Sequence, residues 1–383
     1  MRKVYVIGVG MTQFGKFPEK SFEELGRVAA WEAIKDAGIN PKDIEVAYCG
    51  NMMGGSLFGR DFGVGQLVLR EVGITGIPIA RVENACASGP TAIREAWIAV
   101  GSGLYDIAIA IGVEKLTGAR KGVTAMVGDS IEGVSGLTPA AMWAMRARKH
   151  MEKYGTTLEQ LAKVRVKNQK NGSKNPRAQY QKIYSVEDVL NAPMLSDPLT
   201  ILHACPVTDG AAAAIICSKR VAKKYSSHPI QIAACSLKSG TYPTLRDISV
   251  NDLETRAAKE AYEMAGVGPE DISFAEVHDC FTIAEICRCE NLMLCKEGEG
   301  GRMIEEGISE IGGALPINPR GGLLAMGHPI GATGIAQVAE SVWQLRGQAG
   351  ARQVQGAKVA LTHCSGGFVD DDNGAGSVII LKK

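Results

Sequence analysis

The stretch EAIKDAGINPKDI, residues 32–44, decides the fold because it returns as EAYEMAGVGPEDI at residues 260–272. The two stretches lie 228 residues apart throughout, and without a gap seven positions are identical and an eighth pairs Ile39 with Val267. A second pair, GAAAAIIC (210–217) and GAGSVIIL (374–381), stands near the end of each half of the chain. Self-similarity in fixed register indicates an internal duplication. The sequence therefore predicts two copies of one domain within 383 residues.

Around the repeat, apolar stretches typical of buried strands alternate with helical stretches, which is the pattern of α/β layers. The helix expected at residues 21–37 begins with a capping box made by Ser21 and Glu24. A second helix is expected from about residue 90 to residue 100. Strands are expected at residues 4–9, 44–49, 79–82, 106–112 and 209–217.

One common α/β function is excluded at the first strand. Gly8 and Gly10 follow it, but Gln13 stands where a dinucleotide-binding fingerprint needs its third glycine.

Residues from about 117 to 197 lack strong strand patterns and predict a helical insertion in the first copy. Between residues 146 and 182 this segment carries eleven basic residues against two acidic ones. Such a stretch suits the binding of phosphates, a solvated basic face, or a docking surface for another protein.

Composition points to an ordinary globular protein. The net charge is +1, so nothing favours nucleic acid as a partner. No apolar run approaches the ~18 residues of a membrane span, and the N-terminus does not resemble a signal peptide. Ten cysteines without a secretory signal predict free thiols in a reducing cytoplasm.

Cys86 lies after the strand at 79–82 and at the start of the next predicted helix. Unpaired N–H groups and partial positive charge at a helix start favour a thiolate, which is a nucleophile. The alternative is a buried, inert cysteine.

Two histidines stand at the ends of predicted elements. His328 lies in GHPIGATG (327–334), before a helix expected at about 335–345, and its imidazole can take a proton from a thiol. His278 and Cys280 follow a strand at 272–277, where both can face one cleft. The spacing of Cys280 from the next three cysteines is unusual for zinc, so no metal is predicted.

Near the C-terminus, Cys364 follows a strand expected at 359–361 and precedes Gly366 and Gly367. A thiol beside free glycine N–H groups can pair a proton donor with an oxyanion site. Several cysteines and histidines at the ends of elements therefore predict acyl transfer by a thiolate.

Together these motifs resemble the thiolase superfamily. The resemblance rests on NACASG (84–89), NPRGG (318–322), GHPIGATG (327–334) and CSGG (364–367), and it covers the whole chain. HDCF (278–281) replaces the commoner Asn-Glu-Ala-Phe block and resembles the sterol-carrier-protein type and its archaeal and bacterial relatives.

The resemblance implies a layered α-β-α-β-α fold with a loop domain inserted in the first half. The implied N-terminal half comprises residues 1–118 and 196–225. The inserted loop domain would span 119–195, and the C-terminal half 226–383.

The resemblance also implies roles for the site residues. Cys86 would attack a 3-oxoacyl-CoA and hold the acyl group, after activation by His328. His278 would orient a water in the enolate-binding oxyanion hole, and the backbone N–H groups of Cys86 and Gly366 would form a second hole. Because this chain keeps two candidate thiols, either Cys280 or Cys364 would be the acid/base.

The implied function is thiolytic cleavage of a 3-oxoacyl-CoA, or the reverse Claisen condensation that makes acetoacetyl-CoA from acetyl-CoA. Alternatives are a degradative thiolase for a bulky or aryl substrate such as benzoylsuccinyl-CoA, a ketosynthase of the same fold, and a non-catalytic acyl-CoA or lipid-binding scaffold. Coenzyme A is expected on the insertion at 119–195. A homo-oligomer (a dimer or a dimer of dimers) and a small zinc-ribbon and OB-fold partner protein that helps to bind CoA are also implied.

Overall fold

The computed structural model describes residues 1–119, 134–242, 247–248, 252–369 and 372–383. Nine strands in these residues form one sheet with the order β3-β2-β4-β7-β1-β8-β11-β10-β9. The left part of this order comes from the first half of the chain and the right part from the second. The elements of the first half are β1 (Val4–Met11), α1 (Phe22–Ala37), β2 (Val46–Gly50), β3 (Ile79–Val82), α4 (Ser88–Gly101), β4 (Ile107–Glu114) and β7 (Gly210–Ser218).

The second half repeats this plan, so the predicted duplication is confirmed. In the first half β1, β7 and β4 pair antiparallel, and β4 pairs parallel with β2. In the second half β8, β11 and β10 pair antiparallel, and β10 pairs parallel with β9. The elements are β8 (Ile230–Ser239), α10 (Asp252–Ala265), β9 (Phe274–Glu276), α14 (Ile330–Arg346), β10 (Val359–Val369) and β11 (Asp372–Lys382).

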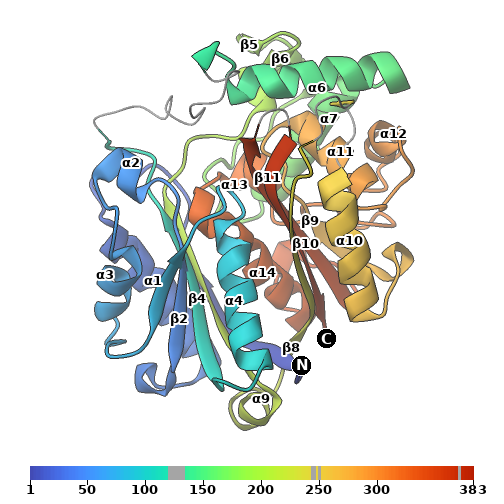
Figure 1. The fold of residues 1–383 in the computed structure, drawn as a ribbon. Coiled ribbons are helices and arrows are strands. Elements are labelled where there is room, and N and C mark those ends of the chain that lie inside the picture. Colours follow the sequence, from blue (N-terminus) through green and yellow to red (C-terminus); the bar gives the residue numbers. More distant parts are fainter. Residues whose placement is uncertain (120–133, 243–246, 249–251, 370–371) are drawn as a thin grey trace.

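The two halves meet where β1 and β8 pair antiparallel over three residues, from Val4 opposite Ile232 to Val6 opposite Ile230. Helices α4 and α14 pack on each other between the two parts of the sheet. Helix α1 covers the outer face of the first part and α10 that of the second (Figure 1). The predicted α-β-α-β-α layering is therefore confirmed.

The capping box predicted at Ser21 is present. The Ser21 hydroxyl accepts from Glu24 N at 3.1 Å, and the Glu24 carboxylate accepts from Ser21 N at 2.7 Å. Helix α1, which begins with this capping box, and its repeat counterpart α10 occupy equivalent outer layers of their own halves.

Helix α14 was predicted to begin near residue 335, and this start was wrong. It begins at Ile330, so two glycines of the GHPIGATG motif lie within its first turns. A Cβ at Gly331 would lie 2.4 Å from Gly50 O, and one at Gly334 would lie 2.3 Å from Pro90 Cδ. Both glycines are thus needed for close packing of α14 on the first half, rather than for a loop.

The tightest contact at this junction predicts a large loss of stability for Gly112→Ala. Its Cβ would lie 2.0 Å from Gly331 O, a backbone atom that cannot move without shifting α14. We expect the free energy of unfolding to fall by about 3 kcal/mol or more, because overpacking of this kind forces backbone shifts. Thermal unfolding followed by circular dichroism measures the effect.

Gly347→Ala is the control for that variant. Gly347 has a φ of 77° and no atom within 4 Å of an added Cβ, so only backbone strain opposes alanine there. Its cost should be about 1–2 kcal/mol. Equal losses in the two variants would show that the contact between β4 and α14 is looser than the structure has it.

The strand predicted at residues 359–361 was too short. Strand β10 runs to Val369, so Cys364 lies within the strand and not after it. Beyond Thr362 the strand keeps β11 as partner but no longer pairs with β9. Glycines hid this continuation from the sequence, because they weaken strand patterns.

The described part of the insertion is mainly helical, as predicted, but it also contains a short hairpin that the sequence did not indicate. It lies above the second half in Figure 1 and packs on α11 (Thr282–Asn291), α12 (Gly300–Glu305) and α13 (Gly322–Met326). The boundaries of the insertion remain predictions, and residues 120–133 lie outside the described residues. Its elements are α6 (Pro139–Tyr154), α7 (Leu158–Gly172), α8 (Val186–Leu190), β5 (Met194–Ser196) and β6 (Leu199–Thr200).

Many basic side chains of the insertion bind carboxylates of the same chain. Lys167 pairs with Glu285 at 2.6 Å in a buried contact, and Lys170 pairs with Glu310 at 2.7 Å. Both carboxylates belong to the second half. Part of the positive charge between residues 146 and 182 therefore fixes the insertion to the second half.

The described residues contain no helix with the length and apolar character required to cross a membrane. None of the ten cysteines forms a disulfide, so the predicted free thiols are present.

Candidate active site

Cys86 occupies a tight turn between β3 and α4. Ala85 has a φ of 47°, a left-handed conformation that costs a non-glycine residue about 1–3 kcal/mol. The Ser88 hydroxyl holds this turn, since it donates to Ala85 O at 2.6 Å and accepts from Asn84 N at 2.9 Å. This strained backbone conformation places the half-buried Cys86 at the wall of a cavity.

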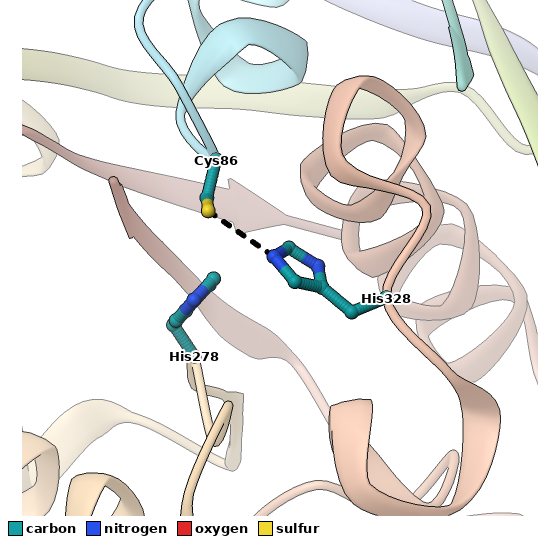
Figure 2. A group of neighbouring side chains, drawn as sticks. All are labelled: Cys86, His278 and His328. Atoms are coloured by element: carbon teal, nitrogen blue, oxygen red, sulfur yellow. Dashed lines mark hydrogen bonds between the residues drawn. The ribbon is translucent and has the colours of Figure 1, made fainter. Parts of the chain in front are cut away.

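His328 points at the Cys86 thiol, as Figure 2 shows, with 3.2 Å between Nε2 and Sγ. Its Nδ1 lies 2.7 Å from the hydroxyl of Thr333, which itself donates to Pro329 O at 3.0 Å. A hydroxyl that donates to a carbonyl can only accept from Nδ1–H. The contacts therefore favour the tautomer whose Nε2 is free to accept a proton from Cys86.

Burial keeps this pair uncharged in the resting site. Burial, with a smaller contribution from the positive charge of Arg320, lowers the pKa of His328 to about 3. Burial also raises the pKa of the Cys86 thiol, although the N–H groups of Cys86 and Gly367 oppose this rise. A neutral thiol and a neutral imidazole thus face each other at pH 7.

His278 approaches the same thiol from the second half of the chain (Figure 2). Its ring lies 5.0 Å from the ring of His328, centroid to centroid, and is turned edge-on to it. His278 Nδ1 lies 3.2 Å from Cys364 Sγ, and that thiol donates to Cys86 O at 2.9 Å. Cys86, His278, His328 and Cys364, all singled out from the sequence, form one cluster.

The ligand atoms of Cys86, His278 and His328 lie within 4.8 Å of one another, which is a donor set that zinc accepts. The sequence predicted no metal, and this stays a prediction.

Cys280 and Gly366 also reach the site. Cys280 lines the cavity, and burial raises the pKa of its thiol to about 12. A Cβ at Gly366 would lie 2.2 Å from Cys86 N, so only glycine permits this approach of β10 to the turn. The backbone N–H groups of Cys86 and Gly367 interact with the Cys86 thiol. The second donor predicted from the sequence was Gly366, which is the residue before Gly367. The oxyanion role of Gly366 stays a prediction.

The cavity has a volume of about 230 Å³ and mostly apolar walls. Three aromatic side chains form one side, with Trp143 stacked on Phe281 at 5.9 Å and edge-on to Phe368 at 6.5 Å. Trp143 comes from the insertion, Phe281 from the HDCF motif and Phe368 from β10. Such a pocket suits a largely apolar substrate brought to a few polar groups.

Comparison with known families settles the identity of this arrangement. The family described as "Thiolase, N-terminal domain" matches residues 4–220, and "Thiolase C-terminal domain-like" matches residues 239–382. The chain belongs to the thiolase family. The family predicted from the sequence motifs is thereby confirmed.

Individual thiolase relatives cover almost the whole chain. The chain is 47% identical over 372 residues to an acetyl-CoA acetyltransferase of Methanothermobacter thermautotrophicus, covering 96% of this chain and 97% of the relative. It is 42% identical to the benzoylsuccinyl-CoA thiolase subunit BbsB of Thauera aromatica, covering 96% and 95%. A solved structure named Ltp2-ChsH2(DUF35) aldolase is 27% identical with a TM-score of 0.83, covering 99% of this chain and 97% of that chain.

Buried carboxylates hold the thiolase motifs in place. Asp279 of the HDCF motif accepts from Leu323 N at 2.6 Å and from the Asn168 amide at 2.8 Å. Glu276 binds Arg320 of the NPRGG motif at 2.7 Å. These contacts fix the two loops that carry His278 and His328 against each other.

Glu114, at the end of β4, is a supporting residue that the sequence did not reveal. Its buried carboxylate accepts from Met52 N at 2.9 Å, Met53 N at 3.0 Å and Gly331 N at 3.0 Å. Burial raises its pKa to about 7, although these N–H donors favour the ionised form. Glu114 thereby ties the cavity wall at Met52 to the start of α14, three residues after His328.

We expect Glu114→Gln to lower kcat about 10-fold or more, since an amide group replaces one accepting oxygen and two N–H donors lose their partner. The active site then loses its fixed geometry, and small misplacements cost much of the rate. Steady-state thiolysis kinetics well below the melting temperature measure the change.

Glu45→Gln is the matched control for Glu114→Gln, because Glu45 accepts from Ile107 N at 3.2 Å at the opposite end of β4. It should keep the wild-type kcat. A loss of kcat in both variants would assign the effect to strand β4 as a whole.

Proposed function

We propose that the protein transfers acyl groups between a 3-oxoacyl-CoA and CoA through an acyl-enzyme on Cys86. The observation that carries this proposal is the 3.2 Å contact between Cys86 Sγ and His328 Nε2 at the wall of the cavity. The tautomer favoured by Thr333 leaves Nε2 ready to accept the thiol proton as the sulfur attacks.

In the cleavage direction, Cys86 Sγ attacks the C3 carbonyl carbon while its proton passes to His328. The C2–C3 bond breaks, and its electron pair forms an enolate on the departing acetyl-CoA. The rings of His278 and His328 lie 5.0 Å apart beside Cys86, which supports the role of both in stabilising that enolate oxygen. A thiol then protonates C2 and becomes a thiolate, which takes the proton of CoA. The CoA sulfur attacks the acyl-enzyme, the bond from the acyl carbon to Cys86 Sγ breaks, and Cys86 recovers the proton held by His328.

The position of Cys280 favours it as the thiol that exchanges this proton. Cys280 lines the cavity, whereas Cys364 is buried and its thiol contacts the carbonyl oxygen of Cys86 and Nδ1 of His278. Cys364 then serves to hold His278 and the turn of Cys86 in place.

The relatives support two substrate classes. The acetyl-CoA acetyltransferase at 47% identity supports acetoacetyl-CoA as product or substrate. The benzoylsuccinyl-CoA thiolase subunit at 42% identity supports a bulkier, aryl-bearing 3-oxoacyl-CoA. The aromatic side of the cavity also supports the second class, since it offers apolar rings to an aryl group.

Coenzyme A would bind along the insertion, whose helix α6 brings Trp143 into the cavity. The similar structure whose title includes DUF35 supports the predicted small CoA-binding partner protein. We also keep the predictions of a homo-oligomer and of a cytoplasmic location.

Trapping of the acyl-enzyme tests this function. The protein is incubated with acetoacetyl-CoA and with bulkier 3-oxoacyl-CoA esters, without CoA, and the peptide that carries Cys86 is examined by mass spectrometry. An acyl group on Cys86, released on addition of CoA, is expected. A protein that binds the esters but never becomes acylated, with or without a partner protein, would be a binding scaffold or an aldolase instead.

A further inference from the structure

The cavity that contains Cys86 has a buried arginine in its wall. Arg288 lies on α11, its side chain is 1% exposed, and it lines the cavity. A buried arginine is rare unless it is paired, because removing its charge from water is costly. None of the proposed chemical steps uses this guanidinium.

The guanidinium of Arg288 makes two contacts within the chain, and at least one of its N–H donors has no partner in the described residues. Its Nη1 binds Glu254 Oε1 at 2.9 Å, and its Nη2 donates to Ser365 Oγ at 3.1 Å. Its Nε donates to no described residue. Ser365 itself lines the cavity, so the guanidinium edge that bears Nη2 is next to the open space.

The face of the guanidinium packs over Trp143, 5.4 Å from the ring centroid. Trp143, Phe281 and Phe368 therefore form an apolar path along the cavity that also contains Cys86 and Arg288. A carbon chain attached to Cys86 can follow these rings and bring a polar end to Arg288.

The positive charge of Arg288 reaches the reacting groups. Burial is the main cause that raises the pKa of Cys280, and Arg288 is the first group that opposes it. Burial also dominates the lowered pKa of His278, and Arg288 contributes to that lowering.

We propose that Arg288 binds a carboxylate on the acyl chain, and that the preferred substrate is a 3-oxoacyl-CoA whose acyl group carries a carboxylate. This inference rests on the proposed thiolase function and names its substrate class. Arg288 determines specificity and takes no part in bond cleavage. An uncharged chain would leave the spare N–H donors buried without a partner, which is a penalty that a carboxylate removes.

The test compares 3-oxoadipyl-CoA with its methyl ester, which differ only in the charge of the chain end. The ratio of their kcat/KM values is measured for the wild type, Arg288→Met and Arg288→Lys. Because the ratio is taken within one protein, a partly unfolded variant does not distort it. The double variant Glu254→Gln with Arg288→Met removes both buried charges and provides a folded form without the arginine.

We expect the wild type to prefer the free acid, and Arg288→Met to lower the ratio by about 10- to 100-fold, as for the loss of a hydrogen bond between charged groups. Arg288→Lys should restore part of it. Two results would overturn the inference and leave the thiolase function intact. The first is an equal loss of kcat/KM for the free acid and for the methyl ester in Arg288→Met, and the second is a wild type that cleaves the methyl ester as well as the acid. If no 3-oxoacyl-CoA acylates Cys86, the proposed function fails and the inference falls with it.

Discussion

Replacing Cys86 by serine is expected to lower kcat for thiolysis at least about 10,000-fold, which is typical of removing a covalent nucleophile. His328, with its pKa lowered to about 3, is a weak base in the resting site. It can assist a thiol, whose proton leaves as the C–S bond forms, but a serine hydroxyl is far less acidic. The loss of the enolate absorbance of a 3-oxoacyl-CoA measures the rate, and mass spectrometry should show no acylation of residue 86.

Cys295→Ser is the control for that variant. Cys295 is also a half-buried free thiol, but it lies outside the cavity, beyond the end of α11. It should keep the wild-type kcat. If the Cys86 variant retained more than about one hundredth of the wild-type rate, a nucleophile other than Cys86 would have to carry the reaction.

Replacing His328 by asparagine should lower kcat about 1,000-fold, within the range known for general acid–base residues. Asparagine can still donate a hydrogen bond to an enolate oxygen, but it cannot take the proton of Cys86. The rate of Cys86 acylation in a single turnover, measured by rapid quenching, should therefore fall more than the affinity for the substrate.

Thr333→Val separates proton transfer from simple packing at His328. The variant removes the hydroxyl that fixes the tautomer, while the shape of the side chain stays nearly the same. We expect a loss of about 10-fold, because His328 then samples the tautomer that cannot accept from Cys86. A Thr333 variant as slow as the His328 variant would indicate that the hydroxyl is needed for the position of the ring itself.

The fold could be predicted because the duplication is visible in the sequence. The repeat at residues 32–44 and 260–272 places α1 and α10, and the rest of each half follows from the alternation of strands and helices. The errors at the start of α14 and at the end of β10 have one cause, which is glycine. Glycine suggested loops at the start of α14 and in the last part of β10, whereas Gly331 and Gly366 are required there by close backbone contacts.

The residues that meet around Cys86 could be predicted, and the buried charged residues around them could not. Cys86, His278 and His328 stand in short, distinctive motifs and meet in one cluster. Glu114 and Arg288 stand in ordinary strand and helix sequence, and only the three-dimensional structure shows that both are buried beside the site. The basic stretch of the insertion suggested phosphate binding, but its partners are distant in sequence, as Lys167 and Glu285 show.

The equivalence of α4 and α14 bears on the origin of the enzyme. Each helix precedes the corresponding strand of its own half, β4 or β10, and each begins at the site, one after Cys86 and the other after His328. In an ancestor built from two identical subunits, both helices would have started with the same residue, and the site would have been symmetric. Nucleophile and base could become different residues only after a duplication produced two copies that change independently, so the division of labour between them is younger than the fold.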